Sequence, residues 1–277
     1  MGAMANRIKR IDTSRRWRPA KHGRPKKVLI VARSLIFWST FTRCDSHSPA
    51  MLLSLRYKFL FVHIAKTGGT SIRDSLWRYK WADPYRIPQF LCGQLSTLTG
   101  HKIGAKFPRH AKLIAAKEML PREIFEDLFK FAFVRNPWDL QVSSYHHIRR
   151  ERPDVITHID SFEAFLRWKF DPARPPQYHA DMSVELQSDY LIDLHGENLI
   201  DFVGRYEYLA EDFAEACRRI GIPCPMLPHA RKAEDRKRDY RAYYNDAMAE
   251  RVANRYWADI ERFGYHFDEP LASNLRR

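Results

Sequence analysis

Apolar residues are arranged along this chain in two alternating patterns. Short apolar runs rich in aromatic and β-branched residues predict buried strands, whereas segments with an apolar residue every three to four positions predict amphipathic helices. The predicted strands are residues 57–64, 131–134 and 201–203. The predicted helices are residues 70–80, 121–129, 137–150, 161–168, 207–220 and 245–263. Because strands and helices alternate, we expect an α/β fold with a mainly parallel central sheet flanked by helices.

Capping residues and helix breakers support these boundaries. Ser161 is a suitable N-cap, and Pro137 stands at a first helical position, where its missing N–H costs no hydrogen bond. Gly221 ends the helix before it. Two segments rich in turn residues, 81–109 and 171–183, are predicted to be loops, and such loops often carry substrate contacts.

The segment after the first strand has the composition of a phosphate-binding loop. Paired glycines allow a tight turn whose N–H groups point at one spot, and the N-terminus of the next helix adds partial positive charge. A lysine adds a full charge, and three hydroxyls can donate to phosphate oxygens. The residues of this loop are Lys66, Thr67, Gly68, Gly69, Thr70 and Ser71. The alternative interpretation is a Gly-Gly turn with an incidental lysine.

The order of residues in the loop differs from that of a nucleoside-triphosphate loop. The latter has the pattern Gly-x-x-x-x-Gly-Lys-Ser/Thr, with the lysine after the glycines. Here Lys66 precedes them, and no clear magnesium-binding acid stands near the loop. A kinase or NTPase is therefore the weaker interpretation.

A second anion site is predicted where the next strand ends. Arg135 follows the strand at 131–134, and parallel α/β sheets bind ligands at the carboxyl ends of their strands. Ser143 lies eight residues further along, about two helical turns into the following helix. An arginine and a hydroxyl at this place can hold a second phosphate.

The two motifs, KTGGTS after one strand and RNPxxxxxS after another, resemble those of the PAPS-dependent sulfotransferases. The similarity is closest to the carbohydrate-type branch, sulfotransferase family 2, and extends to segments 201–213 and 240–267. It implies a P-loop NTPase-like three-layer fold for residues 51–277, with PAPS (3′-phosphoadenosine 5′-phosphosulfate) as co-substrate and no metal. Two positions depart from the family, which usually has proline in place of Ala65 and arginine in place of Leu140.

The resemblance also implies roles for individual residues. It assigns the loop of residues 66–71 to the 5′-phosphosulfate end of PAPS, and Arg135 and Ser143 to the 3′-phosphate. Arg205 and Glu207 resemble the family's Arg-x-Glu motif. This pair is interpreted as mainly structural, although Arg205 could reach the cofactor.

Sulfuryl transfer needs in-line positioning, charge stabilisation on the leaving phosphate, and a base for the acceptor proton. Lys66 fits the second role, unless it binds phosphate equally in the ground and transition states. The family typically has a histidine upstream of the Arg-Asn-Pro strand, so the resemblance makes His110 the general base, unless it only caps or packs near a loop. His63, inside an apolar strand, is interpreted as a hydrogen-bonded core histidine. The remaining candidates for the base are His101, His179 and Glu118.

A basic cluster lies between the last two predicted helices. Its members are Arg231, Lys232, Arg236, Lys237 and Arg238. It is interpreted either as a solvated loop or as a flap over the 3′-phosphate or an acidic acceptor.

Charge and cysteine content add little to the site but bear on the N-terminal segment. The net charge is +14, and residues 1–27 hold ten Lys or Arg against one acid, which leaves about +5 for the rest. Residues 1–50 are expected to be a basic, poorly ordered extension with a short apolar segment at 28–41, where a bilayer span needs about twenty residues. A signal-like anchor and sequence upstream of a start at Met51 are the alternative interpretations of this segment.

The four cysteines include no CxxC pair, so no zinc site is expected, although Cys217 and Cys224 could pair.

These observations favour a sulfotransferase that moves a sulfuryl group from PAPS to a hydroxyl of an acceptor, expected to be a carbohydrate or glycolipid. The alternatives are a nucleotide-dependent small-molecule kinase and a non-catalytic polyanion-binding module that uses the basic extension. Nucleic acid is not the expected partner. Peripheral membrane contact through the basic N-terminal segment is one further expectation.

Overall fold

The computed structural model describes residues 51–81, 83, 107–228 and 236–268. The chain divides into two units, residues 1–48 and residues 49–277. The expected N-terminal extension, most of the loop 81–109, and the candidate His101 lie outside the described residues, so the account below concerns the second unit.

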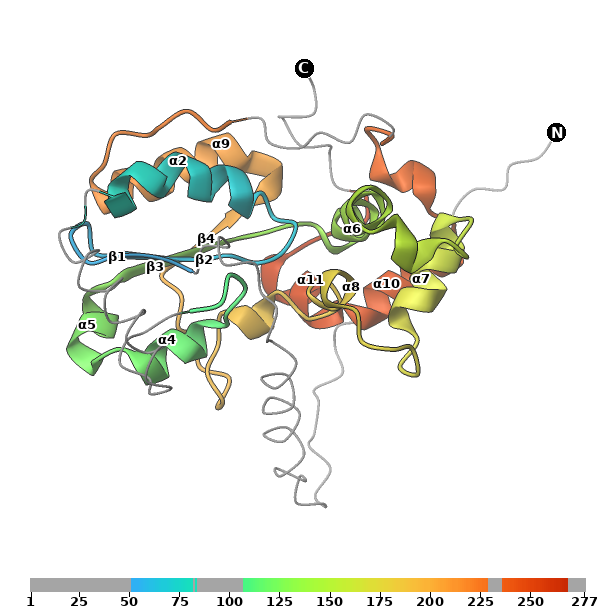
Figure 1. Ribbon diagram of the computed structural model, residues 1–277, viewed down its shortest axis with the longest axis horizontal. Coiled ribbons are helices and arrows are strands. Elements are labelled where there is room, and N and C mark those ends of the chain that lie inside the picture. The colour runs from blue at the N-terminus through green and yellow to red at the C-terminus, as the bar shows by residue number, and fades with distance from the viewer. Residues whose placement is uncertain (1–50, 82, 84–106, 229–235, 269–277) are drawn as a thin grey trace, which may run out of the picture. The chain divides into compact units, whose positions relative to one another are not determined.

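A four-stranded sheet with the strand order β1-β2-β3-β4 forms the centre of the described unit (Figure 1). Its strands are β1 (Leu52–Ser54), β2 (Phe59–Val62), β3 (Phe129–Val134) and β4 (Phe202–Arg205). The last three strands are parallel, and β1 is antiparallel to β2. The prediction of a mainly parallel sheet is confirmed. The additional strand β1 was not predicted, because three residues are too few to show a periodic pattern.

Side chains of the central strands alternate between two buried faces. Phe59 and Phe61 belong to a cluster with α2 (Gly69–Trp81) and α9 (Leu209–Ile220), which cover one face. Leu60 and Val62 belong to a second cluster on the other face, where α4 and α5 lie. The bounds of these two helices are Leu113–Met119 and Arg122–Asp127. With helices on both faces, both sides of each strand are apolar, which explains the continuous apolar runs in the sequence.

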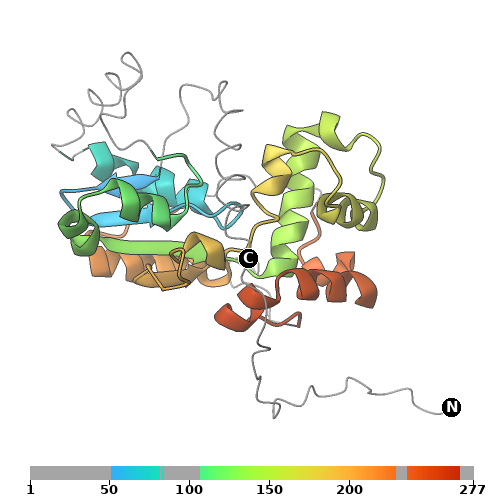
Figure 2. The same ribbon diagram turned by 90° about the horizontal axis from the view of Figure 1, so that it is seen from below.

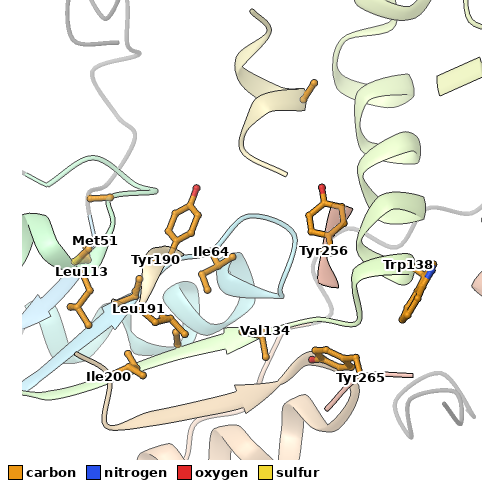
Figure 3. Close-up of a cluster of buried hydrophobic side chains, with 14 of the residues drawn as sticks. Met51, Ile64, Leu113, Val134, Trp138, Tyr190, Leu191, Ile200, Tyr256 and Tyr265 are labelled. Atoms are coloured by element: carbon orange, nitrogen blue, oxygen red, sulfur yellow. The ribbon is translucent and has the colours of Figure 1, made fainter. Parts of the chain in front are cut away.

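The remaining helices gather beyond the carboxyl end of β3 (Figure 2). They are α6 (Pro137–Glu151), α7 (Phe162–Phe170), α8 (Tyr178–Asp181), α10 (Asp246–Arg255) and α11 (Trp257–Phe263). Figure 3 shows that one apolar cluster joins the sheet to this helical part, from Ile64 and Val134 at the strand ends to Trp138 on α6 and to Tyr256. The carboxyl edge of the sheet is therefore packed against these helices through a shared apolar core.

Several predicted boundaries are confirmed and others are wrong. Ser161 accepts a hydrogen bond from the N–H of Ala164 at 3.1 Å, and Gly221 ends α9 with φ of +78°. The single helix predicted at 245–263 is interrupted at Tyr256, which has φ of −111° and ψ of 21° and whose hydroxyl donates to the carbonyl of Ser183 at 2.6 Å. The tertiary contact overrides local helix preference at this point. The loop predicted at 171–183 contains the single turn α8, and α4 was not predicted.

Candidate active site

The loop of residues 66–71 connects β2 to the first turn of α2. Lys66 and Gly68 both have positive φ, +67° and +83°, so the backbone reverses within three residues. An αL conformation is strained for a lysine and is characteristic of functional loops. The next residue, Gly69, is the first of α2, so the N–H groups of this turn lie at a helix N-terminus, where an anion is stabilised.

The hydroxyls of the loop differ in their hydrogen bonding. Thr67 is fully buried and its hydroxyl donates to the carbonyl of Ile64 at 3.0 Å, so it supports the loop from within. The hydroxyls of Thr70 and Ser71 have no hydrogen-bond partner among the described residues. Thr70 is half-buried and Ser71 is buried. The first helical turn therefore keeps two hydroxyls available for an anion.

Arg135 connects the end of β3 to this loop. Its Nη1 donates to the carbonyl oxygen of Lys66 at 2.9 Å, and its Nε donates to Asp139 Oδ2 at 2.7 Å. The guanidinium also stacks on the ring of Tyr206, with Cζ 3.9 Å from the centroid. The backbone N–H of Arg135 donates to the Gln187 side chain at 2.8 Å, and the Gln187 amide donates back to the Arg135 carbonyl at 2.8 Å. Side chain and backbone are thus both fixed at the sheet edge.

Asp139 lies between two arginines. One is Arg135, and the other is Arg236, which approaches from the basic cluster and forms an ion pair with Asp139 Oδ1. The side chain of Asp139 is 6% exposed, so this pairing is shielded from solvent. Leu140, where the family usually has arginine, is buried. Arg231 and Lys232 of the same cluster lie outside the described residues.

Ser143 and Arg205, the other two predicted contacts, differ in their surroundings. Ser143 is half-buried on α6, one helical turn past Asp139, and its hydroxyl has no hydrogen-bond partner within the described ranges. Arg205 is directed to the C-terminal segment, where it donates to the carbonyl of Phe263 and lies 4.7 Å from the centroid of the Tyr265 ring. Those contacts give Arg205 a role in holding the C-terminal segment.

Glu207 also contacts the C-terminal segment, through Tyr265. Its carboxylate accepts from the N–H of Asn136 at 2.7 Å and from the Tyr265 hydroxyl at 3.2 Å. This glutamate therefore fixes the turn between β3 and α6.

Two histidines lie beside the loop of residues 66–71. The ring centroids of His63 and His110 are 4.7 Å apart, and His110 Nδ1 lies 2.8 Å from the backbone carbonyl of His63. A carbonyl only accepts, so Nδ1 carries the proton and Nε2 of neutral His110 keeps its lone pair. Burial is the main cause that lowers the pKa of His110 to about 4. The hydrogen bond to the His63 carbonyl raises this pKa, and the charges of Arg109 and Arg73 lower it further. His110 is therefore neutral at pH 7.

His63 itself is buried and its ring contacts the loop backbone. A Cβ added to Gly69 would lie 2.1 Å from His63 Cδ2, so only glycine fits there. Burial, followed by His110 and the nearby cations, lowers the pKa of His63 well below its usual value. Its Nδ1 has no hydrogen-bond partner among the described residues, so the ring is a packing element without the hydrogen bond that was expected of it.

A second histidine pair was only partly anticipated from the sequence. His147 on α6 and His179 on α8 have ring centroids 5.7 Å apart, and the positive charge of Lys66 helps to lower the pKa of both after burial. His147 was missed, although its position four residues after Ser143 puts both on one face of α6. Glu118 lies on α4 and is exposed.

In the described parts of the chain, no group of three or more His, Cys, Asp or Glu side chains is placed to hold a metal ion. Over the same residues, no helix combines the length and apolarity needed to cross a membrane. Cys217 is buried and Cys224 is exposed, and both are free thiols.

The fold is α/β, and the loop of residues 66–71 and Arg135 lie next to each other at the carboxyl edge of a mostly parallel sheet. A family model with the description "Sulfotransferase family", which represents sulfotransferase family 2, matches residues 49–266. The chain therefore belongs to the sulfotransferase family. It is also similar to an uncharacterized protein of Archaeoglobus fulgidus, with 31% identity over 104 residues, which is 37% of this chain and 75% of the archaeal protein. No solved structure matches the chain.

Proposed function

We propose that this sulfotransferase uses PAPS as donor and transfers its sulfuryl group in line to a hydroxyl of a carbohydrate or glycolipid acceptor. The observation that carries the proposal is the hydrogen bond from Arg135 to the carbonyl of Lys66. It joins an anion-binding loop at the end of β2 to a guanidinium at the end of the neighbouring parallel strand β3. PAPS carries anionic groups at its 5′ and 3′ positions, and a paired site of this kind suits both.

The family motifs assign parts of the nucleotide to these residues. The loop of residues 66–71 would hold the 5′-phosphosulfate, with Lys66 offsetting the charge that grows on the leaving phosphate. Arg135 and Ser143 would hold the 3′-phosphate. Residues 51–277 would form a P-loop NTPase-like sulfotransferase domain. Residues 1–50 would form a basic extension suited to peripheral contact with an anionic surface.

His110 is proposed as the general base. In its neutral form Nε2 can accept the proton of the acceptor hydroxyl while oxygen attacks sulfur and the S–O bond to the leaving phosphate breaks. The product nucleotide is 3′-phosphoadenosine 5′-phosphate (PAP). No metal is invoked, because lysine and arginine supply the positive charge.

Calorimetric titration of PAP and of ATP into the full chain tests this proposal. We expect PAP to bind more tightly than ATP, and Lys66→Met to weaken PAP binding by roughly tenfold or more, because a charge-assisted contact is lost. Lys58→Ala is the matched control, since the Lys58 side chain is 63% exposed and its ion pair among the described residues is a surface contact with Asp127. ATP binding equal to or tighter than PAP would overturn the proposal in favour of a kinase.

A further inference from the structure

His147 and His179 form a second imidazole pair that the proposed chemistry does not use. Their rings are inclined at 62° and both side chains are half-buried. Nδ1 of each ring is buried without a hydrogen-bond partner among the described residues. Buried polar atoms without a partner are uncommon in folded proteins.

The pair lies near the phosphate loop. Asp139, Ser143 and His147 follow one another at four-residue intervals and so share one face of α6. That face is directed toward the loop, because Asp139 pairs with Arg135, whose guanidinium contacts the carbonyl of Lys66. His179 is held against His147 from α8.

Both imidazoles are neutral at pH 7. Burial is the main cause, and the charge of Lys66 lowers the pKa of both further, to about 3 in the case of His147. Two acids oppose this effect on the pair: Glu151 acts on both rings and Asp154 on His179. The other cations that act on them are Arg150 and Arg152.

The tautomer of His147 and His179 is opposite to that of His110. A proton on the enclosed Nδ1 of His147 or His179 would be a donor without an acceptor, so the proton is favoured on Nε2, at the other edge of the ring. In His110 the proton is on Nδ1 instead, because Nδ1–H donates to the carbonyl of His63. The site thus offers one lone pair, on His110, and two N–H donors, on His147 and His179.

We infer that His147 and His179 bind the acceptor, by donating hydrogen bonds to oxygens adjacent to the hydroxyl that gives its proton to His110. The acceptor is then a polyol such as a sugar ring, in which neighbouring hydroxyl oxygens accept these bonds. A lone alcohol would lack the second and third contacts. This inference rests on the proposed function and adds the residues that select the acceptor class.

The test uses the full chain labelled with ¹⁵N in its histidines and saturated with PAP. Methyl glycosides of glucose, galactose and glucuronic acid are the probes. Long-range ¹H–¹⁵N spectra should show His147 and His179 protonated at Nε2 and His110 at Nδ1. At least one glycoside should shift the Nε2 signals of the first two residues.

Matched variants separate a role in acceptor binding from a merely structural role. His147→Phe and His179→Phe keep the ring and remove the donor, and each should weaken glycoside binding about tenfold while PAP affinity stays within about twofold. His147→Gln retains a donor and should recover part of the affinity. His158→Phe, at an exposed position, should change neither affinity.

Two results would overturn the inference. One is an equal loss of PAP and glycoside affinity in the phenylalanine variants, which would put the pair in the nucleotide site. The other is the absence of any shift at His147 and His179 with all three glycosides. Failure of the wild type to bind PAP at all would be seen before any glycoside is added, and would count against the proposed function itself.

Discussion

At the residue scale, the contact between Gly69 and His63 sets the shape of the loop of residues 66–71. A methyl group at position 69 would lie 2.1 Å from Cδ2 and 2.4 Å from Nε2 of the His63 ring. We expect Gly69→Ala to lower the free energy of unfolding by about 2 kcal/mol or more, since an overpacked site must move its neighbours. PAP affinity should fall with it, because the first turn of α2 is displaced.

A double-mutant cycle in urea unfolding checks the cause. His63→Ala removes the ring, so Gly69→Ala should cost much less in that background. If Gly69→Ala were as stable as wild type, or cost the same with and without His63, the close approach would not be what requires glycine.

The protonation of His110 makes a second prediction at this scale. Burial lowers its pKa from 6.5 to about 4, so between these values the unfolded chain binds a proton that the folded chain does not. Stability contributed by the neutral ring is therefore present above about pH 6.5 and lost as the pH falls toward about 4. His110→Gln should flatten the pH dependence of unfolding in this window by about 1–2 kcal/mol, with solvent screening of a half-buried ring taken into account.

Urea unfolding at several pH values measures this slope, with His195→Gln at an exposed position as control. An unchanged slope in His110→Gln would contradict the shifted pKa. Turnover should also fall by roughly 10²–10⁴ in His110→Gln if the ring is the base.

At the scale of elements, the start of α11 positions the end of β3. The carboxylate of Asp259 accepts from the N–H groups of Gln187 and Ser188 at 2.7 and 2.9 Å. Gln187 in turn bonds both backbone groups of Arg135. Asp259 is fully buried, and burial raises its pKa against the effect of these bonds.

We expect Asp259→Ala to destabilise the fold by about 3 kcal/mol, since it leaves buried N–H groups without an acceptor. It should also weaken PAP binding, although Asp259 touches neither predicted phosphate site. The control is Asp154→Ala, which removes an exposed pair with Arg152 and has no contact with Gln187 or Ser188 in the described part of the chain. PAP affinity unchanged in a folded Asp259→Ala would show that this chain of hydrogen bonds does not position Arg135.

Elements with local signals could be predicted from the sequence. The junctions that carry Lys66 and Arg135 were found because apolar runs end there in turn and cap residues. Elements determined by distant contacts were not, such as the break at Tyr256, which depends on the carbonyl of Ser183. In the site, Asp139 pairs with two arginines. One of them, Arg236, is 97 residues away from Asp139 in the sequence, and no periodicity encodes that pairing.

At the scale of the whole described unit, the parallel pairing of β2 and β3 explains why the loop of residues 66–71 and Arg135 lie together. Parallel neighbours end at the same edge of the sheet, so the loop after β2 and the turn after β3 are adjacent although far apart in sequence. The helices α6, α8 and α10 lie beyond this edge (Figure 1). Membership of the sulfotransferase family agrees with this arrangement.

The central claim is that each element recognises one phosphate of the same nucleotide. The most direct measurement is the affinity of wild type, Lys66→Met and Ser143→Ala for PAP, adenosine 5′-phosphate and adenosine 3′-phosphate. We predict that Lys66→Met weakens the first two ligands and spares the third, whereas Ser143→Ala weakens the first and third and spares the second. Equal losses for all three ligands in both variants, or no preference of the wild type for PAP over either monophosphate, would contradict the two-phosphate site.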